Sequence, residues 1–231
     1  MYLSDFNSPE LPSSSISFGS YDLEKYAVSN FSYVPVDWAE GVWYIPLKHL
    51  SLGKEVLEKY RNVLIDPLSS LIHLSPPAYE AIRNTTCKLV NCEAKYNEII
   101  VFDCEKGEEA ALPTLTFRLG EHDYPLSAQH YIGHIDQFCY LQLVPTVLDF
   151  DVLGSPFMRA YYTLFDAESY RIGLARSLNN PFVSSRWYVW LGIGLLGVGL
   201  VGAVGWYLCR SKKTEETTVG LMEPLIRNND D

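Results

Sequence analysis

The sequence predicts a mainly β domain followed by a single transmembrane α-helix, and three observations support this. Before residue 187 the chain contains many short segments rich in β-branched and aromatic residues, bounded by Gly, Pro, Ser, Asn or Asp. The 16 tyrosines and 10 phenylalanines suit the half-buried faces of strands. Residues 187–209 contain no charged side chain, which is typical of a membrane span.

Nine segments are expected to form strands: 16–19, 31–36, 42–46, 63–66, 70–74, 98–103, 114–118, 139–144 and 162–166. Two further segments favour helices. SPPAYEAIRN (75–84) opens with proline and continues with the apolar spacing of a helix. SPFMRAYY (155–162) directly follows a glycine and is expected to form the second helix.

The transmembrane prediction rests on length and on the flanking residues. The 23 residues of 187–209 would rise about 34 Å as a helix, which exceeds a hydrocarbon core of ~30 Å. Aromatic residues mark both ends of this span: Trp187, Tyr188, Trp190, Trp206 and Tyr207. The span therefore predicts a single-pass membrane protein.

The orientation follows from the basic residues beside the span. Arg210, Lys212 and Lys213 follow it directly, which predicts that residues 210–231 are cytosolic. The ectodomain is then lumenal or extracellular, on the secretory or endolysosomal route. The formal net charge of −10 argues against nucleic acid as a partner.

The cysteines are consistent with an oxidising compartment. Four of the five precede the span, which predicts two disulfides among Cys87, Cys92, Cys104 and Cys139. We favour the pairs Cys87–Cys92 and Cys104–Cys139, although three pairings are open. With this topology, the sequons at Asn30 (NFS) and Asn84 (NTT) predict N-glycosylation.

No metal site is expected. The chain contains no CxxC motif, and the histidines of HYIGH, His130 and His134, share a helical spacing in a segment that reads as strand and loop. The N-terminal stretch MYLSDFNSPELPSSS has neither a basic n-region nor an apolar h-region. We therefore expect that translation starts elsewhere or that this chain is a piece of a longer one.

Three parts of the sequence together resemble the C-terminal lobe of pepsin-like aspartic proteases. They are ISFGSYDLEKY (16–26) with FSYVPVDWAEGVWYIPLKHLSLG (31–53), FDCEKGEEAALPTLTFRLGEHDYPLSAQHYI (102–132), and VLGSPFMRAYYTLFDAESYRIGLA (152–175). The resemblance implies a single pepsin-like lobe over residues 1–177. A juxtamembrane linker (178–186), the transmembrane helix (187–209) and a cytosolic tail (210–231) would follow.

In the same register, VLIDPLSSLI (63–72) is similar to the second active-site strand of that family, where two apolar residues precede Asp-Thr-Gly. The resemblance places Asp66 at the catalytic aspartate. Ser69 and Ser70 keep the polar pair that follows, whereas Pro67 and Leu68 replace Thr and Gly. Leu68 adds a side chain where the family has none, and Pro67 removes a backbone N–H donor.

Two other residues near this loop have expected roles. The resemblance implies that Gly154 completes a turn packed against the Asp66 loop. His73 follows Asp66 on the expected strand 70–74, and strand alternation predicts that its side chain lies on the opposite face.

The chemistry of this family requires two carboxylates, one from each lobe. Because two such close charges cannot both ionise, one carboxyl acts as acid and the other as base that activates water. This chain contains one such loop, and its first residues are similar to the strand that opens the second lobe. Catalysis would then require a first lobe, or a homodimer that pairs two copies of Asp66.

Two interpretations stay open at this point. The leading one is the C-terminal lobe of a membrane-anchored aspartic endopeptidase, inactive as this chain alone. Given a first lobe, it would hydrolyse polypeptide substrates with no metal or organic cofactor. The alternative is a non-catalytic, membrane-tethered β protein with a binding or structural role, derived from such a lobe. Pro67 and Leu68 favour this alternative.

Overall fold

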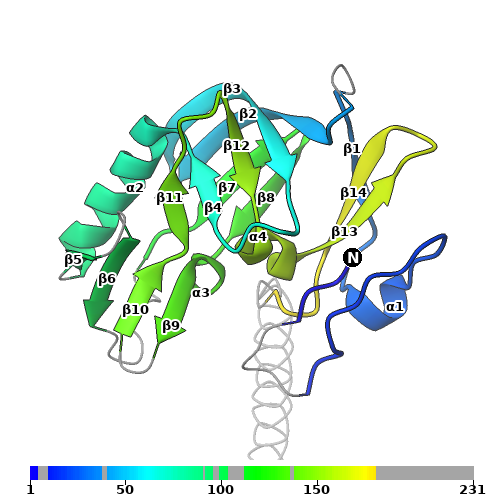
Figure 1. The fold of residues 1–231 in the computed structure, drawn as a ribbon, viewed down its shortest axis with the longest axis horizontal. Coiled ribbons are helices and arrows are strands. Elements are labelled where there is room, and N and C mark those ends of the chain that lie inside the picture. The colour runs from blue at the N-terminus through cyan, green and yellow to red at the C-terminus, as the bar shows by residue number, and fades with distance from the viewer. Residues whose placement is uncertain are drawn as a thin grey trace, which may run out of the picture. The chain divides into compact units, whose positions relative to one another are not determined.

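The computed structural model describes residues 1–4, 10–37, 41–90, 92–95, 99–103, 112–135 and 138–180. These residues belong to one structural unit, Met1–Phe182. They form three β-sheets and four helices (Figure 1). The mainly β prediction for this part of the chain is confirmed.

The largest sheet has seven strands: β2 (Tyr44–Leu52), β3 (Glu55–Ile65), β4 (Ile72–Leu74), β7 (Leu115–Leu119), β8 (His122–Leu126), β11 (Leu143–Pro145) and β12 (Phe150–Leu153). Their spatial order is β11-β4-β12-β3-β2-β7-β8. β3 and β12 run parallel, with Leu153 opposite Ile65 at their ends. Because the two strands end side by side, the loops that follow them must meet (Figure 1).

The hairpin between β2 and β3 has a local cause in the sequence. Its loop consists of Gly53 and Lys54, and Gly53 has a φ of 59°. Glycine adopts positive φ at little cost, so it suits the first position of a two-residue hairpin loop. The hairpin makes β3 an 11-residue strand, longer than the predicted segment 63–66.

The second sheet has the order β1-β14-β13, formed by β1 (Ser32–Pro35), β14 (Arg171–Arg176) and β13 (Tyr161–Asp166). The third has the order β5-β6-β10-β9, formed by β5 (Cys92–Lys95), β6 (Ile99–Asp103), β10 (Phe138–Leu141) and β9 (Ile132–Ile135). All pairings in these two sheets are antiparallel.

The helices are α1 (Leu23–Tyr26), α2 (Pro76–Leu89), α3 (Ala128–Tyr131) and α4 (Ser155–Ala160). The longest, α2, begins where predicted because Ser75 caps it and proline occupies its first position. It continues beyond residue 84, and Tyr79, Ile82 and Thr86 form its buried face. α4 follows Gly154 directly, also as predicted.

Aromatic side chains dominate the core behind α4. Phe157 is fully buried and contacts Phe117, Tyr161 and Tyr124, with ring centroids 5.7, 4.9 and 6.3 Å apart. Aromatic pairs at such separations stabilise beyond the burial of their area. A second cluster contains Tyr2, Tyr26 and Tyr162.

Some predictions about elements were wrong. Residues 16–19 form no strand, and strands β5, β8, β9, β12 and β14 and the short helices α1 and α3 were missed. β12 escaped prediction because its sequence, FDVL, contains a charged residue within a short apolar run. No helix among the described residues is long and apolar enough to cross a membrane. The predicted span 187–209 and tail 210–231 lie outside those residues.

Candidate active site

Asp66 stands immediately after β3, where that strand ends beside β12. Its backbone N–H donates to the carbonyl oxygen of Leu153 at 3.2 Å, and its own carbonyl accepts from the N–H of Ser69 at 3.3 Å. The first bond ties Asp66 to the end of β12, and the second closes a turn around it. The side chain is partly exposed. The aspartate is therefore held by backbone bonds and remains accessible.

The carboxylate of Asp66 has a backbone donor. The N–H of Leu68 donates to Oδ1 of Asp66 at 2.9 Å. Leu68 does not adopt positive φ, so its Cβ causes no strain there. Its side chain is 93% exposed, directed away from the core. The loop thus accommodates Leu68 where the family pattern has glycine, and it keeps a hydrogen bond to the aspartate.

Gly154 packs against the loop that carries Asp66. A Cβ at this position would overlap the carbonyl oxygens of Ser69 and Leu71 and would lie 2.9 Å from Cβ of Ser69. The next residue, Ser155, donates to the carbonyl oxygen of Ser69 from both its N–H (2.8 Å) and its hydroxyl (3.0 Å). Only glycine allows this close approach.

His73 also belongs to the surroundings of the loop. Its Nε2 lies 3.1 Å from the hydroxyl oxygen of Ser69, which in turn donates to the carbonyl of Leu71 at 2.8 Å. Burial lowers the pKa of His73 below its usual value, and the negative charge of Asp66 opposes that shift. The imidazole therefore lies within the electric field of the aspartate.

The expected placement of His73 on the opposite face was wrong. Strand β4 begins only at Ile72, and the chain between Asp66 and Ile72 forms a turn. Strand alternation does not carry through a turn, so sequence spacing could not place the ring. The one available signal was the presence of a histidine seven residues after the aspartate.

An apolar cavity of about 640 Å³ begins beside the loop. Ser70, the second serine of the polar pair, is exposed and forms part of its wall. The other lining residues come from the loop and from β6, β9 and β10: Leu71, Ile99, Val101, Ile135, Phe138 and Tyr140. A cavity with such walls suits an apolar group.

A second, more polar groove of about 900 Å³ is lined by Pro67 of the same loop. Segment 16–21 and strand β13 supply most of its walls. Phe18 in this segment is 92% exposed. Leu68, in the loop itself, is similarly exposed.

The two histidines of HYIGH contact other protein groups. His130 is buried, with Nδ1 3.1 Å from the hydroxyl of Ser127 and Nε2 3.3 Å from the carbonyl of Asn179. His134 is exposed, and its Nδ1 lies 3.4 Å from Sγ of Cys139. Among the described residues no cluster of three His, Cys, Asp or Glu side chains could hold a metal ion.

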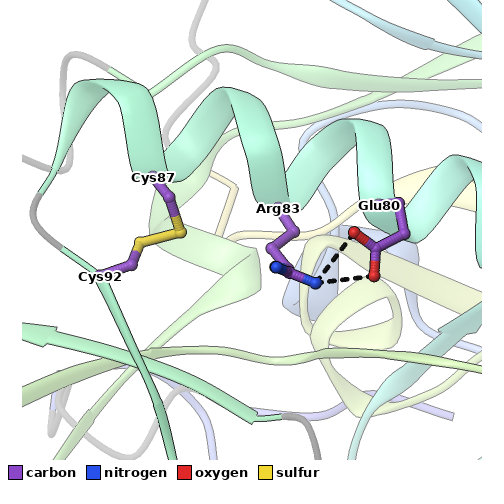
Figure 2. Close-up of a disulfide and its surroundings, with 4 residues drawn as sticks. All are labelled: Glu80, Arg83, Cys87 and Cys92. Atoms are coloured by element: carbon purple, nitrogen blue, oxygen red, sulfur yellow. Dashed lines mark hydrogen bonds and ion pairs between the residues drawn. A yellow bond between two sulfur atoms is a disulfide. The ribbon is translucent and has the colours of Figure 1, made fainter.

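One predicted disulfide joins Cys87 at the end of α2 to Cys92 at the start of β5 (Figure 2). Cys139 is also disulfide-bonded, and its expected partner, Cys104, lies outside the described residues. The sequon residues Asn30 and Asn84 are both exposed. Both asparagines are therefore accessible to solvent, although Thr86 of the second sequon is buried on α2.

Comparison with known proteins places these features in a family. The family model described as eukaryotic aspartyl protease matches residues 1–177. Cathepsin D of Clupea harengus is 29% identical over 164 residues, which cover 66% of this chain and 40% of the relative. Renin-2 of Mus musculus is 30% identical over 178 residues (72% and 42%), and gastricsin of Rattus norvegicus 29% over 175 residues (71% and 42%). The chain spans less than half the length of these relatives.

Proposed function

Because the chain belongs to the eukaryotic aspartyl protease family, we propose that it supplies Asp66 as one of the two catalytic carboxylates in peptide-bond hydrolysis. The observation that carries this proposal is the geometry of the loop. Asp66 is accessible, its backbone is tied to the end of β12, and its carboxylate accepts the N–H of Leu68 at 2.9 Å. Such fixed support is what a carboxylate needs to activate a water molecule.

The second carboxylate must come from another lobe. A single aspartate cannot act as acid and base at once, and the sequence contains one loop of this type. The exposed side chains of Leu68 and Phe18 lie around the loop, where a further lobe would cover them. That lobe is either a first lobe of the family type or a second copy of this chain.

The proposed substrate is a polypeptide bound in an extended form. The cavity beside Ser70 has an apolar lining and a volume of about 640 Å³, so it accepts an apolar side chain of such a substrate. No metal or organic cofactor takes part, because the carboxylates themselves exchange the protons and activate the water.

We place this reaction at a membrane on the secretory or endolysosomal route. The disulfide Cys87–Cys92 supports an oxidising compartment, and residues 187–209 supply the anchor. We expect glycans at Asn30 and Asn84, because this topology puts both sequons on the lumenal or extracellular side. The tail 210–231 is then cytosolic.

A second candidate function is a membrane-tethered binding or structural protein without catalysis. The observation that favours it is the loop sequence, because Pro67 and Leu68 stand where the family pattern has Thr and Gly. Pro67 offers neither a hydroxyl nor an N–H. In this function the apolar cavity beside Ser70 and the more polar groove beside Pro67 would bind a partner without cleaving it.

The test is complementation. The full chain is produced together with a family first lobe, and both hydrolysis of peptides at pH 4–5 and binding of a pepstatin-type inhibitor are measured. The proposal expects both activities with the lobe and their loss in Asp66→Asn, which keeps the shape of the side chain. A folded chain that neither cleaves nor binds the inhibitor with the lobe would support the binding function. Hydrolysis by the monomer alone would overturn the need for a second carboxylate.

A further inference from the structure

Asp151 links three segments of the chain that neighbour the Asp66 loop in the fold. It lies on β12 and is fully buried, with 0% of its surface exposed. Its Oδ1 accepts from Nε of Arg61 on β3 at 2.9 Å and from the N–H of Ser75, the N-cap of α2, at 3.0 Å. β3 leads into Asp66 and β12 leads into Gly154. Ser75 directly follows β4, the strand after the loop. One side chain therefore bonds to every segment that flanks the loop.

A second carboxylate, Glu58, faces the same arginine. Its Oε1 lies 3.6 Å from Nε of Arg61. In a regular strand, residues three apart point to opposite faces. Between them, however, Tyr60 has a φ of 56°, which is rare for a residue other than glycine. This left-handed backbone conformation at Tyr60 interrupts the alternation of side chains, so Glu58 and Arg61 share a face of β3.

The charges in this cluster do not balance. Two carboxyl groups face one guanidinium, and Oε2 of Glu58 and Oδ2 of Asp151 are both buried without a hydrogen-bond partner. A buried polar atom without a partner is costly. A single proton held between the two carboxyls would satisfy both atoms and make the cluster neutral.

No other charged group among the described residues offsets this imbalance. α2 contributes only the backbone N–H of Ser75. On β4, His73 pairs with Val152, the neighbour of Asp151, so its side chain lies on the other face of the sheet. The loop before β12 contains Asp149, which is exposed, and a carbonyl at Leu148 that accepts from Arg61 at 2.6 Å.

Burial, and then the charge of Glu58, raise the pKa of Asp151 to about 7, while Arg61 acts in the opposite direction. An acid whose pKa is raised in the folded state stabilises the fold when protonated. That stabilisation is complete below the ordinary value of 3.8 and is lost as the pH rises through about 7. Acidification from neutral pH therefore strengthens this part of the fold.

We propose that Glu58, Arg61 and Asp151 bind one proton jointly and, in that state, hold together the three backbone segments that flank the Asp66 loop. The cluster acts as a positioning device, because none of its side chains lines the cavity beside Ser70 or the groove beside Pro67. Any effect of the cluster on catalysis rests on the proposed function. Proton binding by the cluster and its stabilisation of the fold do not depend on that function, and both are tested without measuring activity.

The experiment compares thermal unfolding of the full chain at pH 5 and pH 8. The wild-type unfolding midpoint is expected to be lower at pH 8 than at pH 5 by roughly 5 °C. Asp151→Asn copies the protonated acid, since its amide can donate to Glu58 while its oxygen accepts from Arg61. This variant should lose most of the pH difference, and Glu58→Gln should do the same. The control is Asp166→Asn, whose carboxylate pairs with Arg171 at 2.7 Å and has a lowered pKa, so it does not titrate in this window.

A second measurement needs no variant. Hydrogen exchange of the wild-type chain, expressed as protection factors, should show stronger protection of the amides of Asp66 and Ser75 at pH 5 than at pH 8. Equal protection at both values, or an Asp151→Asn variant with the full wild-type pH difference, would overturn the proposal. If catalysis fails in the complementation test while these results hold, the proposed function is wrong and the proton-binding cluster stands.

Discussion

Leu68 donates its backbone N–H to Oδ1 of Asp66 at 2.9 Å, although its side chain is almost entirely exposed. The residue therefore acts on the aspartate through its backbone. A hydrogen bond to a carboxylate is stronger than one between neutral groups, and it fixes where the carboxylate points. The loop Asp-Pro-Leu therefore supplies a backbone donor to its aspartate although Pro67 has no N–H.

The first prediction separates the backbone of Leu68 from its side chain. Leu68→Ala should change the free energy of unfolding by less than about 0.5 kcal/mol, since little area is buried. Leu68→Pro removes the N–H and should destabilise by roughly 1–3 kcal/mol. Denaturant unfolding of both variants measures the difference. Equal stability of the two would show that the N–H of Leu68 does not support Asp66.

The second prediction concerns the contact of Gly154 with the loop. Gly154→Ala places a Cβ on the carbonyl oxygens of Ser69 and Leu71, so one backbone must move. Overpacking typically costs about 1–3 kcal/mol, and a Cβ against two backbone oxygens should lie at the upper end of that range. Denaturant unfolding should show that loss, and complementation should show reduced inhibitor binding because the loop shifts.

The matched control for this contact is Ser155→Ala. It removes the hydroxyl bond to the carbonyl of Ser69 and leaves the N–H bond at 2.8 Å. A loss of about 1 kcal/mol with unchanged inhibitor binding is expected. If Gly154→Ala proves as mild as Ser155→Ala, Gly154 does not pack closely against the loop.

The third prediction contrasts two features on α2 (Figure 2). The disulfide Cys87–Cys92 closes a short loop, so replacing both cysteines with serine should destabilise by about 2 kcal/mol. Arg83 pairs with Glu80 at 2.8 Å on the surface of the same helix, and Arg83→Ala should cost less than about 0.5 kcal/mol. Unfolding curves under non-reducing conditions test both. A larger loss for Arg83→Ala than for the serine pair would contradict this ranking.

The sequence predicted those elements whose signals are local. Ser75 and the prolines after it indicated the start of α2, and Gly154 indicated the start of α4. The aromatic-rich segments became β1, β7 and β13 because their side chains suit a half-buried sheet. The parallel pairing of β3 with β12 could not be read from spacing, since it joins residues 88 positions apart.

The site was predicted as a set of residues, and its geometry was not. Resemblance located Asp66, Ser69 and Gly154, which the structure brings together. The place of His73 depends on where the turn ends and β4 begins, a boundary that periodicity does not determine. The sequence did not predict a structural role for Asp151, because a charged residue beside a short apolar run usually marks the end of a strand. Only the fold shows that Arg61 and Ser75 lie within reach of it.

The fourth prediction concerns the pH dependence of stability that His73 creates. Because burial lowers its pKa, the unfolded chain binds a proton more readily than the folded chain does. His73 should therefore weaken the fold as the pH falls through 6.5, its ordinary value, towards its folded pKa. His73→Gln cannot take up this proton, and its unfolding midpoint should rise more on acidification than that of the wild type. Parallel midpoints in both proteins would show that His73 does not resist protonation.

The fifth prediction tests whether Asp66 and His73 are neighbours. The negative charge of Asp66 raises the pKa of His73 and offsets part of the effect of burial. Asp66→Asn removes that charge, so the pKa of His73 should fall further below its usual value. NMR titration of the imidazole measures this, with the His73 signal assigned by its absence in His73→Gln. Asp166→Asn, whose carboxylate pairs with Arg171, serves as the control and should leave the titration unchanged. An unchanged titration in Asp66→Asn would mean that the imidazole of His73 does not lie in the field of the aspartate.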